Sequence, residues 1–148
     1  MELRNLLVPI ADNSESERAM DVACRLATDR GATITVVNVV EVPAVLPLGA
    51  HMTEEEGAAH RLLERAAAVA ATYGVVALPR ILHGRDAGEQ IVAYAAQRHV
   101  EMIVLGAPRK RRKPFGSTVE HVLRKADCRV MLIGAAPEQE SVAHHAAA

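Results

Sequence analysis

An apolar run, Met102 to Leu105, ends at Gly106, and five consecutive basic residues follow it, Arg109 to Lys113. Gly116 and Ser117 then open a segment with helical spacing. Backbone N–H groups at a helix start lack intrahelical partners and attract anions, and glycine lets a backbone approach a phosphate closely. This stretch predicts either a phosphate site or, more simply, two glycine turns around a solvated basic loop.

Patterns for catalysis or metal binding are scarce. The sequence has no GxxxxGK[ST] loop, no pyrophosphatase-type SGG loop and no Gly-x-Ser-x-Gly elbow. No general base stands out near the basic loop; His121, one helical turn after Ser117, is a candidate, although a helical histidine is more often a surface residue. Cys24 and Cys128 lie far apart with no ligand spacing. We therefore expect no catalytic residues, no metal ligands and no disulfide.

Composition points to one domain with an aliphatic core. The chain has 148 residues, of which 50% are hydrophobic but only 2% aromatic. This bias suits helices packed on a parallel sheet, and it offers few rings for stacking nucleic-acid bases, so no specific nucleic-acid partner is expected. The net charge of −1 makes the basic run a local feature. Without a signal-peptide pattern or a membrane-length apolar stretch, the sequence predicts a cytoplasmic location.

The elements that would position the basic loop alternate along the chain. Four segments begin with a small polar residue followed three residues later by Glu, a capping-box pattern, and continue with apolar residues at helical spacing. These pairs are Ser14/Glu17, Thr53/Glu56, Asp86/Glu89 and Ser117/Glu120. The first two helices are predicted to stop at Gly31 and Gly74.

Short aliphatic runs between these helices are predicted to be strands. They are Leu6–Ile10, Thr33–Val40, Val75–Leu82, Met102–Leu105 and Arg129–Ile133. The alternation predicts an α/β fold with a parallel sheet and helices on both faces. Glu41–Met52 fits no period and is expected to be a long loop. We expect one domain over residues 1–136 and a flexible tail over residues 137–148.

The chain resembles the universal stress protein family from about Leu3 to Ile133. NLLVPI followed by SERAMDVACRLA resembles the first strand and helix of that family, and ITVVNVVEV its second strand. LHGRDAGEQIVAYAAQRHVEMIVLG and FGSTVEHVLRKADCRVMLI are similar to the later elements. The resemblance implies a five-stranded, Rossmann-like parallel sheet with strand order 3-2-1-4-5, a homodimer built through the last strand, Arg129–Ile133, and ATP binding in many members.

The family's ATP-binding pattern is Gly, two residues, Gly, nine residues, then Gly-Ser or Gly-Thr. Gly106 and the pair Gly116-Ser117 match its ends, whereas Arg109 replaces the middle glycine and only six residues follow it before Gly116. The family's aspartate after strand one aligns with Ala11. The resemblance thus implies binding of an adenine nucleotide (ATP, AMP or a cyclic adenine nucleotide), with or without Mg²⁺, by Pro9, Ile10, Ala11, Asp12, Val39, Leu105, Gly106, Arg109, Gly116, Ser117 and Thr118.

Three functions remain open at this stage. The first is a non-enzymatic, dimeric adenine-nucleotide sensor in a stress response, in which Arg109 to Lys113 pair with phosphates. The second is a dimeric interaction module without nucleotide, whose basic run binds an acidic protein or a membrane surface. The short basic loop and the LVPIADN start are similar to stress-protein-like domains of amino-acid permeases, which would make a transporter the partner and the membrane the location. The third is a nucleotide-hydrolysing or adenylating enzyme.

Overall fold

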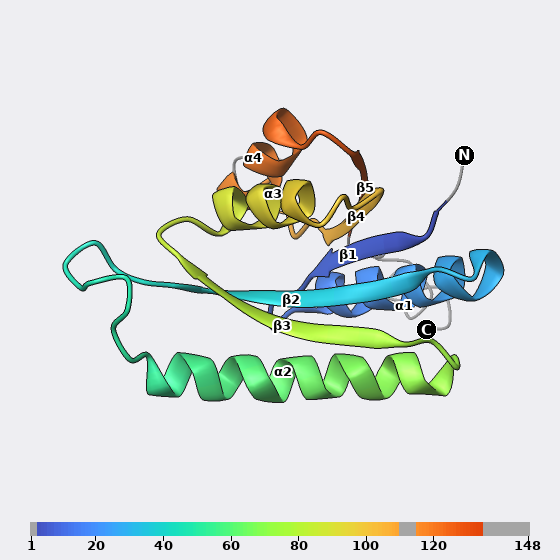
Figure 1. The fold of residues 1–148 in the computed structure, drawn as a ribbon, viewed down its shortest axis with the longest axis horizontal. Coiled ribbons are helices and arrows are strands. Elements are labelled where there is room, and N and C mark those ends of the chain that lie inside the picture. The colour runs from blue at the N-terminus through green and yellow to red at the C-terminus, as the bar shows by residue number, and fades with distance from the viewer. Residues whose placement is uncertain (1–2, 110–114, 135–148) are drawn as a thin grey trace, which may run out of the picture.

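The computed structural model describes residues 3–109 and 115–134. Strands and helices alternate along the chain, as predicted from its sequence (Figure 1). The strands are β1 (Asn5–Pro9), β2 (Thr33–Glu41), β3 (Ala77–Gly84), β4 (Met102–Gly106) and β5 (Arg129–Ile133). The helices are α1 (Ser14–Arg30), α2 (Thr53–Thr72), α3 (Ala87–Gln97) and α4 (Ser117–Lys125). The basic residues 110–113 and the predicted tail at 137–148 lie outside the described residues.

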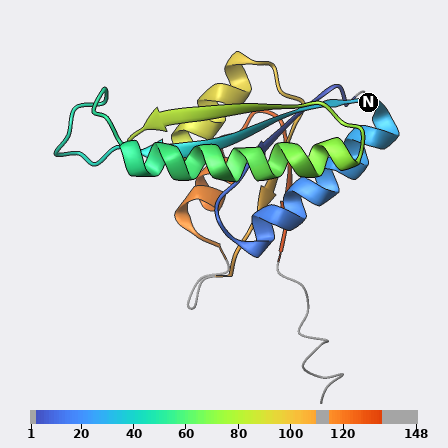
Figure 2. The same ribbon diagram turned by 90° about the horizontal axis from the view of Figure 1, so that it is seen from below.

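All five strands are parallel, and their order across the sheet is β3-β2-β1-β4-β5, which confirms the expected fold class. Helices α1 and α2 cover one face, and α3 and α4 cover the other (Figures 1 and 2). Successive side chains of a strand point to opposite faces. In β1, Leu6 and Val8 therefore face α1 and α2, whereas Leu7 faces α3 and α4.

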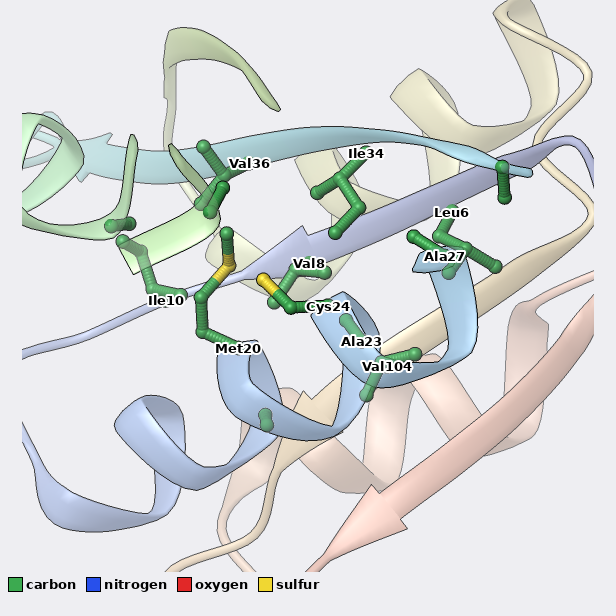
Figure 3. Packing of buried hydrophobic residues seen from close by; sticks show 14 of the residues in the cluster. Leu6, Val8, Ile10, Met20, Ala23, Cys24, Ala27, Ile34, Val36 and Val104 are labelled. Atoms are coloured by element: carbon green, nitrogen blue, oxygen red, sulfur yellow. The ribbon is translucent and has the colours of Figure 1, made fainter. Parts of the chain in front are cut away.

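The core beneath α1 is aliphatic, as the composition predicts. Figure 3 shows side chains of α1, β1, β2 and β4 converging there, among them Met20, Cys24 and Val104. Cys24 is fully buried, and this burial raises the pKa of its thiol to about 11. It is therefore a small, protonated core residue and not a nucleophile.

The helix starts differ from the capping-box prediction. Ser14, Thr53 and Ser117 were expected to cap their helices, but each is the first helical residue. The N-cap positions are occupied by Asn13, whose side chain caps α1, and by Met52 and Gly116, which make no side-chain cap hydrogen bond. The looser variant is the one that caps as predicted: Asp86 accepts a hydrogen bond from the Glu89 amide at 2.9 Å. The position at which the chain turns into the helix therefore decides which residue stands at the N-cap, whether or not its side chain can accept a hydrogen bond.

The helix ends follow the glycines. Gly31 and Gly74 adopt left-handed backbone conformations, with φ of 67° and 69°, directly after α1 and near the end of α2. The amide of Val75 donates back to the Ala70 carbonyl at 3.0 Å. Because this closes the end of α2, β3 begins at Ala77, two residues later than predicted.

Within the described residues, no helix combines the length and the apolar character needed to cross a bilayer.

Candidate functional site

Two central strands separate at their carboxyl ends. Strand β1 pairs with β2 over five residues but with β4 over only two, ending at Leu7↔Ile103. The Ile10 amide donates to the Val37 carbonyl of β2 at 2.8 Å. Since amides alternate in direction along a strand, the preceding nitrogen, that of Pro9, faces β4 and has no hydrogen to donate. The sheet therefore opens between β1 and β4, where the strand order reverses and α/β folds bind ligands.

A cleft of about 350 Å³ lies over this opening, a size typical of small-molecule sites. Its walls come from the ends of β1, β2 and β4 and from the first turns of α1, α3 and α4. The lining residues are Pro9, Ile10, Ala11, Asn13, Ser16, Val37, Asn38, Val39, Glu41, Ala87, Ile91, Leu105, Gly106, Pro108, Gly116, Ser117, Thr118 and Val119.

The turn between β1 and α1 uses its polar groups internally. Ser16, buried at 6% exposure, accepts a hydrogen bond from the Ala11 amide through its hydroxyl at 2.9 Å. The side chain of Asn38 donates to the Ile10 carbonyl at 2.7 Å, which ties the turn to β2. This wall of the cleft is therefore rigid and offers few free backbone donors to a ligand.

Two of the three helices that begin at the cleft are capped by side chains. Asn13 and Asp86 each accept from the amide of the third residue of their helix, at 2.7 and 2.9 Å. In α3 the carboxylate of Glu41 also accepts from the first amide, that of Ala87, at 2.9 Å. These side chains occupy the amides that would otherwise attract an anion.

The third helix, α4, has no such cap. Gly116 precedes it and has no side chain to offer, and the first intrahelical bond runs from the Glu120 amide to the Gly116 carbonyl at 3.1 Å. The amides of Ser117, Thr118 and Val119 therefore have no intrahelical acceptor. Ser117, Thr118 and Val119 line the cleft, and within the described residues no side chain caps this helix start, so its dipole and amide donors could attract an anionic group.

Gly106 lines the cleft and also packs closely against α1. A Cβ on this residue would lie 2.6 Å from the Glu15 carbonyl carbon and 2.7 Å from the Ser16 amide nitrogen. The missing side chain thus makes room for the first turn of α1. This close approach of two backbone segments is a requirement for glycine that was not predicted from the sequence.

The floor of the cleft on the β2 side is apolar. Val37 and Ile91 are fully buried, Leu105 is buried, and Val39 is half-buried. Polar groups border this floor only at its edges, where Asn38 and Glu41 lie. An apolar floor with a few polar groups at its rim suits an aromatic heterocycle.

Nine of the eleven sequence-predicted site residues line the cleft. Asp12 and Arg109 do not: the Asp12 side chain is 89% exposed and pairs with Arg65 of α2 at 3.6 Å, and Arg109 is exposed. Asp12 follows a turn whose backbone is held by Ser16, so its carboxylate points away from the cleft.

His121 also lies elsewhere than at the cleft. Its side chain packs on Gly88 of α3, where an added Cβ would lie 2.8 Å from the His121 Cβ. Among the described residues, no cluster of three or more His, Cys, Asp or Glu side chains is arranged to hold a metal ion. The described part of the cleft thus contains the amide donors of the α4 start and an apolar floor. His121, the candidate general base, packs between α3 and α4.

Comparison with known proteins identifies the family of the chain. The model of the universal stress protein family matches residues 2–134. The chain belongs to this family. Among solved structures, the universal stress protein UspA from Lactobacillus plantarum has 24% identity and a TM-score of 0.76, with 90% of this chain and 99% of that chain covered. A search of curated proteins found no match.

Two similar structures of universal stress proteins were solved with nucleotides. The protein from Archaeoglobus fulgidus in complex with dAMP has 24% identity and a TM-score of 0.74, covering 90% of this chain and 99% of that one. A universal stress protein in complex with cAMP has 17% identity and a TM-score of 0.75, covering 90% and 98%. At these identities the likeness shows that the fold is shared.

Proposed function

We propose that this universal stress protein binds an adenine nucleotide in the cleft and acts as a regulatory protein without catalytic turnover. The observation that carries the proposal is the uncapped start of α4 at the cleft, next to an apolar floor. The complexes of similar proteins with dAMP and cAMP support the ligand class.

In this proposal the two ends of the ligand meet different chemistry. The phosphate accepts hydrogen bonds from the amides of Ser117 and Thr118 and from their hydroxyl groups. The base lies on the apolar floor beside Val39 and Ile91. The nucleoside thereby covers apolar surface while the charged end remains at the helix start.

Replacing Ser117 with Asp is the direct test of the phosphate end. An acidic residue in the first turn favours the helix dipole, so the variant is expected to fold, but its carboxylate repels a phosphate at the same amides. We expect AMP affinity, measured by isothermal titration calorimetry, to fall at least about tenfold, because a charge-assisted hydrogen bond is lost and a like charge is added. Adenosine, which has no phosphate, is expected to bind both proteins equally.

The matched control is Ser117→Asn, which has nearly the same shape as the Asp variant and no charge. It is expected to retain AMP affinity within about threefold, because the backbone donors remain. If the native protein binds neither ATP, AMP nor cAMP at millimolar concentration, the proposed function is wrong. Equal loss of adenosine and AMP binding in Ser117→Asp would instead place the phosphate elsewhere.

We also propose a homodimer that forms through β5. Arg129–Ile133 is an edge strand, and the outer edge of such a strand presents unpaired backbone groups. Four of its five residues are apolar and half-buried, from Val130 to Ile133. We expect sedimentation equilibrium at micromolar concentration to give twice the chain mass of 15.9 kDa, and a monomer at that concentration would contradict the assignment.

A cytoplasmic location is part of the same proposal. Cys24 and Cys128 are both free cysteines, as expected in a reducing compartment.

A further inference from the structure

Glu41 is an acidic side chain on the wall of a cleft that we have assigned to an anion. It follows Val37 and Val39 at intervals of two along β2, so all three face the same side of the sheet. Exposure rises along this row, from the buried Val37 to the exposed Glu41. The carboxylate therefore lies at the rim, where the apolar floor ends.

The carboxylate is held in place by one of its two oxygens. Oε2 accepts from the Ala87 amide at the start of α3, at 2.9 Å. Within the described residues, Oε1 makes no hydrogen bond, and the Glu41 residue lines the cleft. A fixed carboxylate with one free oxygen can accept a hydrogen bond from a ligand, and it repels ligand oxygen atoms that carry no hydrogen.

Glu41 and the phosphate end of the cleft are far apart. Glu41 is on β2 and the α4 start follows β4, with β1 between the two strands. Two inter-strand spacings amount to about 10 Å. In a 5′-nucleotide the sugar hydroxyls lie close to the phosphate, whereas the base edge is the part farthest from it. Of the ligand's hydrogen-bond donors, the one that reaches Glu41 is therefore on the base.

We propose that Glu41 is a specificity-determining residue that accepts a hydrogen bond from the exocyclic 6-amino group of adenine through Oε1. This assignment rests on the proposed function of the cleft. Hypoxanthine and guanine have a carbonyl oxygen at the same ring position. This oxygen would face the Glu41 carboxylate, and the two acceptor oxygens would repel each other. The residue thus favours 6-amino purines over 6-oxo purines.

The test compares AMP, IMP and GMP on the native protein and on Glu41→Gln by isothermal titration calorimetry. We expect the native protein to bind AMP at least about tenfold more tightly than IMP or GMP, as one hydrogen bond to a charged acceptor at an exposed site would give. In Glu41→Gln, the side-chain oxygen can still accept from Ala87, and the amide NH₂ then faces the base. The ratio of AMP to IMP affinity is expected to fall about tenfold.

Glu64→Gln is the matched control, because it removes one exposed carboxylate from the middle of α2, away from the cleft. It is expected to keep the native AMP to IMP ratio. If the native protein binds AMP, IMP and GMP equally, or prefers GMP, the role of Glu41 is wrong while nucleotide binding stands. An unchanged ratio in Glu41→Gln overturns it as well. If none of the three nucleotides binds, the proposed function itself fails, and this assignment fails with it.

Discussion

Replacing Gly106 with alanine is expected to destabilise the fold by about 3 kcal/mol, at the upper end of the cost of overpacking. The added Cβ would lie 2.6 Å from the Glu15 carbonyl carbon and 2.7 Å from the Ser16 amide nitrogen. These are backbone atoms in the first turn of α1, which cannot rotate away as a side chain can. Either α1 must shift from the sheet or β4 must bend, and both strain a buried contact. Urea denaturation followed by circular dichroism measures the effect.

The control for this variant is Gly49→Ala, in the loop between β2 and α2. An added Cβ there has no atom within 4 Å, and its backbone is not left-handed. Loss of glycine freedom in the unfolded chain then stabilises the protein by a few tenths of a kcal/mol, or leaves it unchanged. A loss of less than about 1 kcal/mol in Gly106→Ala would show that the two elements accommodate a methyl group.

Truncating Leu7 to alanine is expected to cost about 3–4 kcal/mol. Leu7 has 0% exposure and lies in the central strand, facing the core beneath α3 and α4. Its neighbours on that face include Val37 and Ile103. Both belong to paired strands that cannot collapse into the space left behind, so the cavity term adds to the lost burial.

Leu78→Ala is the matched control for this truncation. Leu78 lies on the edge strand β3 and is 46% exposed, so the same deletion removes little buried area. We expect it to cost below about 1 kcal/mol in the same denaturation experiment. If the two variants lose equal stability, the core assignment of Leu7 is wrong.

The helices and strands could be predicted from the sequence because each has a local sequence signal. Aliphatic runs such as Thr33–Val40 are too short for helices, and Gly31 and Gly74 end the helices at left-handed positions. The strand order depended on the family resemblance. Contacts between β1 and β4 join residues nearly one hundred positions apart, and no local pattern encodes them.

Local signals were less successful for the details of the site. Three of the predicted caps were displaced by one residue, and the close packing of Gly106 on the first turn of α1 was not predicted. Asp12 was expected at the cleft because it follows β1, but the internal bond between Ala11 and Ser16 turns it towards Arg65. The direction of a side chain in a tight turn depends on tertiary hydrogen bonds that sequence patterns do not carry.

Asn38 and Glu41 were missed for a related reason. Asn38 lies in a run that the sequence presents as an aliphatic strand, where a polar residue resembles an interruption of the core. Glu41 was assigned to the loop after that strand, whereas β2 extends one residue further and includes it. The signal that could have found Glu41 is the period of two from Val37 through Val39, which places it on the face of the cleft. That inference also requires that the end of β2 lies beside the start of α3. Only the structure shows this, through the pairing of Glu41 with Gly84 of β3 and the hydrogen bond from the Ala87 amide.

Pro9 in the central strand β1 has a consequence for how a ligand would enter the cleft. Since the nitrogen of Pro9 cannot donate, β1 lacks the backbone hydrogen bond to β4 that another residue at this position could make. The separation of β1 and β4 at this point thus follows from the amino-acid sequence and does not require a bound ligand. If a nucleotide binds there, as we propose, the two strands need not separate to admit it, and this step adds no delay to association.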